Sequence, residues 1–131
     1  MHILLVDDAK DTRDLYRLVF DLAGFCTSVA EDGTQAVQAV KEATKPFDVI
    51  VLDVEMPLMN GWQALSLIRQ MPQGQQVPVV MWTAYGDSSG NADSELAIRA
   101  AQAGANRLIH KPMLPSKLVR VLREVVEHPH S

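Results

Sequence analysis

Carboxylates, a hydroxyl and an ammonium group stand at the ends of short apolar runs in this chain. In chain order these residues are Asp7, Asp8, Asp53, Thr83 and Lys111. Three carboxylates that lie together raise the pKa of at least one of them unless a cation enters. Oxygen donors suit a hard divalent ion, and Mg²⁺ in particular accepts few protein ligands and keeps several waters. If the runs end at one place in the fold, the sequence predicts a magnesium site there.

The same residue types could carry out phosphoryl transfer. A carboxylate beside Mg²⁺ can attack phosphorus and form an acyl phosphate. The metal and Lys111 would neutralise charge on the transferring group, and the Thr83 hydroxyl could donate a hydrogen bond to one of its oxygens. Each residue alone is explained as simply by a turn, a helix cap or a solvated chain end. Their shared position at strand ends is what favours a site.

Length, charge and cysteine content limit the possible functions. The 131 residues fit one domain, and the apolar fraction of 47% argues against disorder. The formal charge of −4 argues against binding to DNA or to an anionic membrane. The lone Cys26 excludes an intrachain disulfide and suits a reducing compartment. Because neither a signal peptide nor an apolar run of roughly 20 residues is visible, we expect a cytoplasmic protein.

Five short apolar runs recur along the chain, and helical spacing separates them. The runs cover residues 2–6, 25–29, 48–52, 77–82 and 106–110. The first and third do not alternate with polar residues, which indicates parallel strands buried on both faces by helices. We therefore predict an α/β fold, a doubly wound five-stranded parallel sheet built from five βα units. Ligands of such a sheet bind beyond the carboxyl ends of its strands, where the polar residues would meet.

Two of the predicted helices have informative apolar faces. In the first, Leu15, Leu18, Val19 and Leu22 share one side and are predicted to face the core, with Gly24 as the C-terminal stop. In the last, which follows Pro115, the apolar residues span a wider arc than the roughly 100° that a core-facing helix needs. The surplus is either a surface for a partner or part of a deeply docked helix.

The motifs at these strand ends resemble those of the response-regulator receiver domain, the phosphoacceptor module of two-component signalling. The resemblance rests on the stretches 4–8 and 53–61, on Thr83-Ala84, and on Gly104-Ala105 leading to Lys111-Pro112. It implies a flavodoxin-like (βα)5 fold with strand order 2-1-3-4-5. It also implies a receiver domain over residues 1–127, followed by a C-terminal tail over 128–131.

The resemblance assigns a role to each acidic residue. Asp53 would be the phosphoacceptor and a ligand of Mg²⁺. Asp8 would be the main side-chain ligand of the metal, with Asp7 supporting it, and Glu55 would supply its backbone carbonyl. The cofactor is therefore expected to be Mg²⁺.

The resemblance also implies the remaining site residues and the partners. Thr83 would move toward the phosphoryl group and Lys111 would pair with it, beside a cis Lys111–Pro112 bond. The donor would be a sensor histidine kinase or a histidine phosphotransfer protein. The chain would be a stand-alone switch, not an enzyme with a separate substrate, and would catalyse only its own aspartyl phosphorylation and dephosphorylation. It would signal to a downstream protein or onward through a phosphorelay, and could form a homodimer through its fourth and fifth helices.

Three departures from the family pattern affect how such a switch would work. Receivers often carry Tyr or Phe where this chain has Leu108, so another coupling to the output must be considered. The loop 87–93 is longer than usual, and is either a harmless insertion or an element that contacts a partner. We hypothesise that Glu55 and Tyr85 hinder the water that attacks the acyl phosphate. The alternative is that Glu55 pairs with Lys10 and Tyr85 packs on the surface.

Other functions fit the sequence less well. A phosphohydrolase of the haloacid-dehalogenase type carries Asp-x-Asp, whereas this chain has Asp53-Val54-Glu55, and it would turn over a phosphate ester steadily. A degenerate receiver used only for binding is a third class, but all the ionisable positions are intact. A nucleotide-binding domain would need a Gly-rich loop after the first strand, and that loop is absent.

Overall fold

The predicted strands form one parallel sheet in the computed structural model. The structure describes residues 1–84 and 91–128. Within the fourth helix it describes side chains from residue 95 on. The elements are β1 (His2–Val6), α1 (Lys10–Leu22), β2 (Cys26–Ala30), α2 (Gly33–Glu42), β3 (Val49–Asp53), α3 (Gly61–Gln70), the 3₁₀ turn η1 (Pro72–Gly74), β4 (Val79–Thr83), α4 (Asn91–Ala103), β5 (Arg107–His110) and α5 (Pro115–Glu127). The strand order is β2-β1-β3-β4-β5, and all four pairings are parallel. The predicted fold class and strand order are confirmed.

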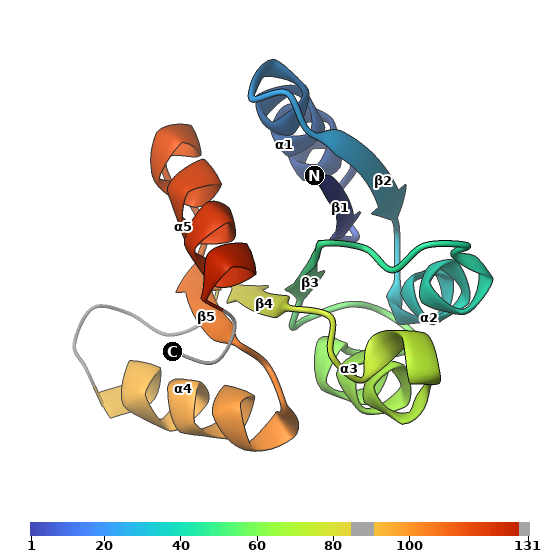
Figure 1. The fold of residues 1–131 in the computed structure, drawn as a ribbon. Helices are drawn as coiled ribbons and strands as arrows, with labels where there is room; N and C mark the ends of the chain where they lie inside the picture. The colour runs from blue at the N-terminus through green and yellow to red at the C-terminus, as the bar shows by residue number, and fades with distance from the viewer. Residues whose placement is uncertain (85–90, 129–131) are drawn as a thin grey trace.

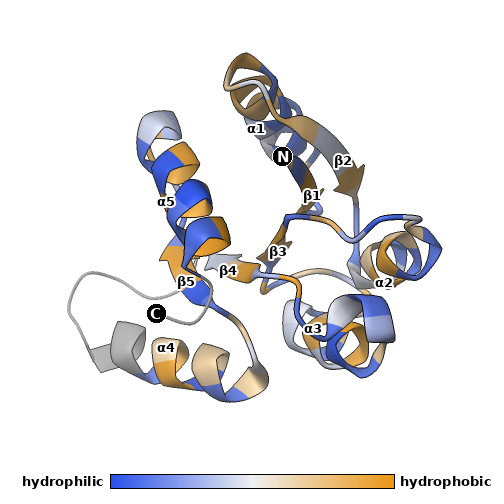
Figure 2. Ribbon diagram, viewed as in Figure 1, coloured by the Kyte–Doolittle hydropathy of each residue, from blue (hydrophilic) through white to orange (hydrophobic). Residues whose placement is uncertain are grey.

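Helices cover both faces of the sheet (Figure 1). Helices α1 and α5 pack on one face, whereas α2, α3 and α4 pack on the other. In β1, Ile3 and Leu5 join the first layer, while Leu4 and Val6 join the second. This alternation of two buried faces is why the strand sequence shows no polar positions. Figure 2 shows the result as hydrophobic strands enclosed by helices that carry both colours.

The first helix buries a different side from the one predicted. The leucines expected in the core are exposed: Leu15, Leu18 and Leu22, at 52%, 55% and 81%. The buried residues are Tyr16 and Phe20, and Val19 packs against them in part. The Tyr16 ring lies edge-on to that of Trp82, with 4.9 Å between the ring centroids. The helix carries two apolar stripes, and the one with aromatic rings fills the layer beneath α1.

The last helix is docked deeply, so its wide apolar arc belongs to the core. In α5, Leu118, Val121, Leu122 and Val125 are buried, while Val119 and Val126 are partly buried against the same cluster. The surplus apolar surface is therefore not a separate face for a partner. Within the described ranges, no helix has both the length and the apolar character needed to cross a bilayer.

The orientation of α1 can be checked by two alanine substitutions. Phe20→Ala should lower the free energy of unfolding by about 3 kcal/mol, because it leaves a cavity in a closed layer. Leu22→Ala should change it by less than about 0.5 kcal/mol, because that side chain is already in solvent. Urea unfolding followed by circular dichroism measures both. Equal losses in the two variants would mean that α1 is rotated relative to this structure.

Candidate functional site

Three carboxylates meet at the carboxyl edge of the sheet. Oxygen atoms of Asp7, Asp8 and Asp53 lie within 4.8 Å of one another. Asp7 and Asp53 are 0% and 2% exposed, whereas Asp8 faces solvent. They come from the ends of β1 and β3, which are neighbours in the sheet. The predicted cluster is confirmed, and its all-oxygen donor set with one side open to water suits a hard divalent cation.

Lys111 reaches this cluster from the end of β5. Its Nζ atom lies 2.6 Å from Oδ2 of Asp7 and 3.2 Å from Oδ2 of Asp53. The Lys111–Pro112 peptide bond is cis, as predicted. Burial by itself lowers the pKa of the ammonium group, but the hydrogen bond to Asp7 and the charge of Asp53 outweigh it, so the pKa is raised. Lys111 therefore stays charged between the two carboxylates.

One positive charge does not fully balance the buried acids. Burial raises the pKa of Asp53, and the negative charge of Asp7 adds to this effect. Lys111 opposes the shift, and so does the Glu55 backbone N–H, which donates to Oδ1 of Asp53 at 3.2 Å. The net result raises the pKa of Asp53 from 3.8 to about 7. Ionised Asp53 is thus costly in the absence of a further cation, and a divalent ion at the cluster would remove that cost.

Trp82 is a site residue that sequence analysis missed. Its indole N–H donates to Oδ2 of Asp7 at 3.2 Å, inside the core. The Lys111 ammonium lies 5.0 Å from the centre of the Trp82 ring, so the indole contacts both partners of the ion pair. On the other side of the carboxylate, Oδ1 of Asp7 accepts the N–H of Ala9 at 2.9 Å. A tryptophan at a buried strand end needs an acceptor for its N–H, and that need was the available signal.

Thr83 and Glu55 are hydrogen-bonded to each other. The Thr83 side chain is fully buried at the end of β4. Its hydroxyl donates to the Glu55 carboxylate, with distances of 3.0 and 3.1 Å to the two oxygens. The alternative that Glu55 pairs with Lys10 is wrong, because the Lys10 ammonium lies 2.8 Å from Asp14 on the same helix. Tyr85 lies outside the described residues.

The loop after β3 is held close to Asp53 by its last residues. Asn60 and Gln63 form a reciprocal capping box at the start of α3, with bonds of 2.9 and 3.0 Å. The Gly61 N–H donates to the Val54 carbonyl at 2.8 Å. A Cβ at Gly61 would collide with the carbonyl oxygen of Asp53. This close approach explains why the Asn-Gly pair follows the acidic strand end.

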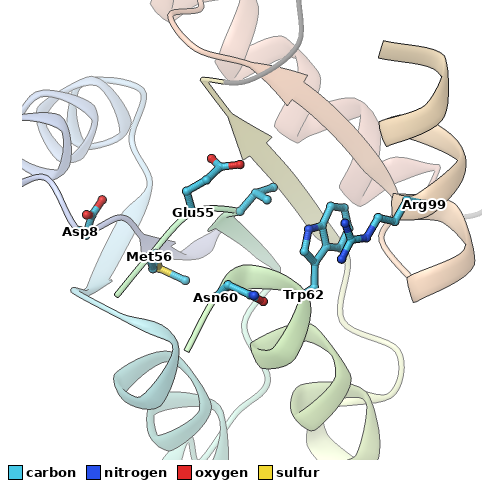
Figure 3. Close-up of a pocket in the computed structure, with 7 residues that line it drawn as sticks. Asp8, Glu55, Met56, Asn60, Trp62 and Arg99 are labelled. Carbon is cyan, nitrogen blue, oxygen red and sulfur yellow. The ribbon is translucent and has the colours of Figure 1, made fainter. Parts of the chain in front are cut away.

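A cleft of about 580 Å³ opens beside the carboxylates. Figure 3 shows Asp8 at one end and Arg99 at the other, with Glu55 at the rim between them. The Arg99 guanidinium lies 4.5 Å from the centre of the Trp62 ring and so links α4 to α3. Space for a reacting group is therefore available at the mouth of the acidic cluster.

The residues that depart from the family pattern are placed as follows. Leu108 of β5 is partly buried and packs against the core cluster under α2, α3 and α4. The predicted loop 87–93 is wrong at its end, because α4 begins at Asn91 and residues 91–93 form its first turn. Residues 87–90 lie outside the described residues. That the switch reaches its output without an aromatic side chain at position 108, by another coupling, stays a prediction.

The comparisons with known proteins agree with this geometry. The model of the response regulator receiver domain matches residues 3–123. The chain belongs to this family. Receiver domains are the phosphorylation-dependent switches of two-component signalling, so the function predicted from the sequence is confirmed at that level.

Two solved structures and one curated protein show what this receiver domain is similar to. Chemotaxis protein CheY4 of Vibrio cholerae has 29% identity and a TM-score of 0.83, with 95% of this chain and 97% of CheY4 covered. The receiver domain of sensor histidine kinase PA1611 from Pseudomonas aeruginosa PAO1 has 28% identity and a TM-score of 0.82, with 96% and 97% covered. That structure holds a magnesium ion in its active site cleft.

The curated relative is the transcriptional regulatory protein CpxR of Escherichia coli (strain K12). It is 34% identical to this receiver over 129 residues, which are 98% of the present chain and 50% of CpxR. The receiver thus spans about half the length of that relative.

The charge imbalance at Asp53 predicts a specific pH dependence of stability. Between about pH 4 and pH 7 the folded receiver holds a proton on Asp53 that the unfolded chain has released, so the metal-free protein should lose stability as the pH rises. Asp53→Asn removes this loss and should raise the free energy of unfolding by about 1–4 kcal/mol at pH 8. At pH 4 the two proteins should be similar.

Urea unfolding in the presence of a chelator measures this difference. As a control, added Mg²⁺ should stabilise the wild type more than the asparagine variant. A variant no more stable than the wild type at pH 8 would show that the buried carboxylate is not a source of instability.

Proposed function

We propose that this receiver accepts a phosphoryl group on Asp53, with Mg²⁺ bound by Asp7, Asp8, Asp53 and the backbone carbonyl of Glu55. The observation that carries the proposal is the burial of two carboxylates against one ammonium group at a cluster open to water through Asp8. The magnesium ion in the related PA1611 receiver supports the choice of metal. When bound, Mg²⁺ supplies the positive charge that the cluster lacks and that a phosphoryl group needs.

In the proposed reaction Asp53 is the nucleophile. A carboxylate oxygen of Asp53 forms a bond to phosphorus while the bond from phosphorus to the donor's imidazole nitrogen breaks, and the leaving imidazole takes up a proton. Lys111 is already oriented toward Asp53, and it would pair with a phosphoryl oxygen without a large movement. Thr83 would donate a hydrogen bond from its hydroxyl to another phosphoryl oxygen.

We also propose partners for the receiver and bounds for the receiver domain. The donor is a sensor histidine kinase or a histidine phosphotransfer protein, and the receiver catalyses its own phosphorylation and dephosphorylation. The output passes to a downstream protein or along a phosphorelay, with the surface of α4 and α5 as the contact region, where a second copy could also bind. The module spans residues 1–127, which agrees with the end of α5. No binding to DNA or to a membrane is proposed, and a cytoplasmic location stays a prediction.

The proposal is tested by intact-protein mass after incubation with acetyl phosphate. The wild type should gain one phosphoryl group when Mg²⁺ is present and none when a chelator replaces it. Asp53→Asn should gain none in either case. Lys111→Ala should be phosphorylated at least about 100-fold more slowly, because it loses a preoriented cation. Continuous release of phosphate over many turnovers would instead support a phosphohydrolase, and phosphorylation of the asparagine variant would exclude Asp53 as the acceptor.

A further inference from the structure

The carboxylate of Glu55 accepts the hydrogen bond from the Thr83 hydroxyl that a phosphoryl group on Asp53 would need. We infer that Glu55 is a positioning residue that holds the Thr83 hydroxyl in the unphosphorylated receiver and gives it up when Asp53 is phosphorylated. This inference rests on the proposed phosphorylation of Asp53. Glu55 would compete with the phosphoryl group for the Thr83 hydroxyl. It would also be a second residue, besides Thr83, whose hydrogen-bond partner changes on phosphorylation.

The backbone fixes the positions of the two partners. Asp53 and Thr83 are the last residues of adjacent strands, and the Val54 N–H donates to the Trp82 carbonyl at 3.0 Å. The Glu55 N–H is bound to Oδ1 of Asp53 at 3.2 Å. The Glu55 backbone is therefore tied to the acceptor residue, while its side chain reaches across to the end of the next strand. Both carboxylate oxygens lie within 3.1 Å of the Thr83 hydroxyl.

A hydroxyl group has one proton to donate, so Thr83 cannot serve two anionic acceptors at once. In the unphosphorylated receiver that proton points to Glu55, whose negative charge makes the hydrogen bond a strong one. A phosphoryl group on Asp53 would compete for the same proton and would also repel the nearby carboxylate. Phosphorylation thus exchanges the acceptor of Thr83 and releases the side chain of Glu55.

Space is available for the released side chain of Glu55. Glu55 is partly exposed and stands at the rim of the cleft (Figure 3). Its displacement would alter the surface of the loop between β3 and α3. This loop leads into α3, whose Trp62 contacts Arg99 of α4. The exchange therefore couples Thr83 to the surface through Glu55. Such a coupling needs no aromatic side chain at Leu108.

The test is the affinity for beryllofluoride, which mimics a phosphoryl group on a carboxylate, measured with saturating Mg²⁺. Four proteins are compared by titration followed by tryptophan fluorescence: wild type, Glu55→Ala, Thr83→Ala and the double variant. Removing Glu55 should tighten binding about tenfold in the wild-type background, because no hydrogen bond to a charged acceptor has to be broken. In the Thr83→Ala background the same change should tighten binding no more than about threefold, since only charge repulsion is relieved.

Glu31→Ala is the matched control, because it removes one carboxylate from the same edge of the sheet. Glu31 is exposed and lies 3.5 Å from Arg13. Its removal should leave the beryllofluoride affinity within about twofold of the wild type. If Glu55→Ala tightens binding equally in both Thr83 backgrounds, Glu55 acts by charge alone. If it weakens binding or has no effect, Glu55 does not compete for the hydroxyl. Each of these results overturns the inference.

A second measurement does not depend on phosphorylation. The urea midpoints of the same four proteins are compared without metal or beryllofluoride. The hydrogen bond predicts non-additive losses, with a coupling of roughly 0.5 M in the midpoint. Additive losses would show that the bond does not form in the resting receiver, even if Asp53 is phosphorylated normally. A receiver that fails to bind beryllofluoride but shows the coupling would instead count against the proposed function, and with it against the exchange, although the Glu55–Thr83 hydrogen bond itself would stand.

Discussion

The contact of the Lys111 ammonium with Asp7 and Asp53 is the interaction on which the rest of the site depends. Two carboxylates buried at the edge of a hydrophobic sheet would be prohibitively costly without it. Lys111 lies within 3.2 Å of both, and the Trp82 indole contacts the same ammonium and the same Asp7 oxygen. The charge balance is still incomplete, because Asp53 keeps a raised pKa and the cluster gains from a second cation. A resting site of this kind is prepared for a divalent metal and a phosphoryl group.

The sheet was predictable because its constraints are local and repeated. Apolar runs with no polar positions require two covered faces, and the carboxyl ends of parallel strands must share an edge. These two constraints are enough to bring Asp7, Asp53, Thr83 and Lys111 to the same edge of the sheet. The family pattern then accounts for the cis Lys111–Pro112 bond.

What could not be predicted depends on tertiary packing. Helix α1 carries two apolar stripes with acceptable helical spacing, and the choice between them is made by the ring of Trp82, against which Tyr16 packs. Likewise, a glutamate two residues after a strand end has many possible partners. Only the register of β3 with β4 shows that Glu55 reaches Thr83 and not Lys10. Side-chain partners across strands were the missing information.

The central claim is that Asp53 is the residue phosphorylated in this receiver. The most direct test is to phosphorylate the protein with acetyl phosphate and Mg²⁺, reduce the acyl phosphate with borohydride, and map the peptides by mass spectrometry. Hydride reduction of an aspartyl phosphate leaves homoserine at the modified position. We expect homoserine at position 53, and none when Mg²⁺ is withheld. Homoserine at position 7 or 8, or a phosphoryl group that resists borohydride, would contradict it.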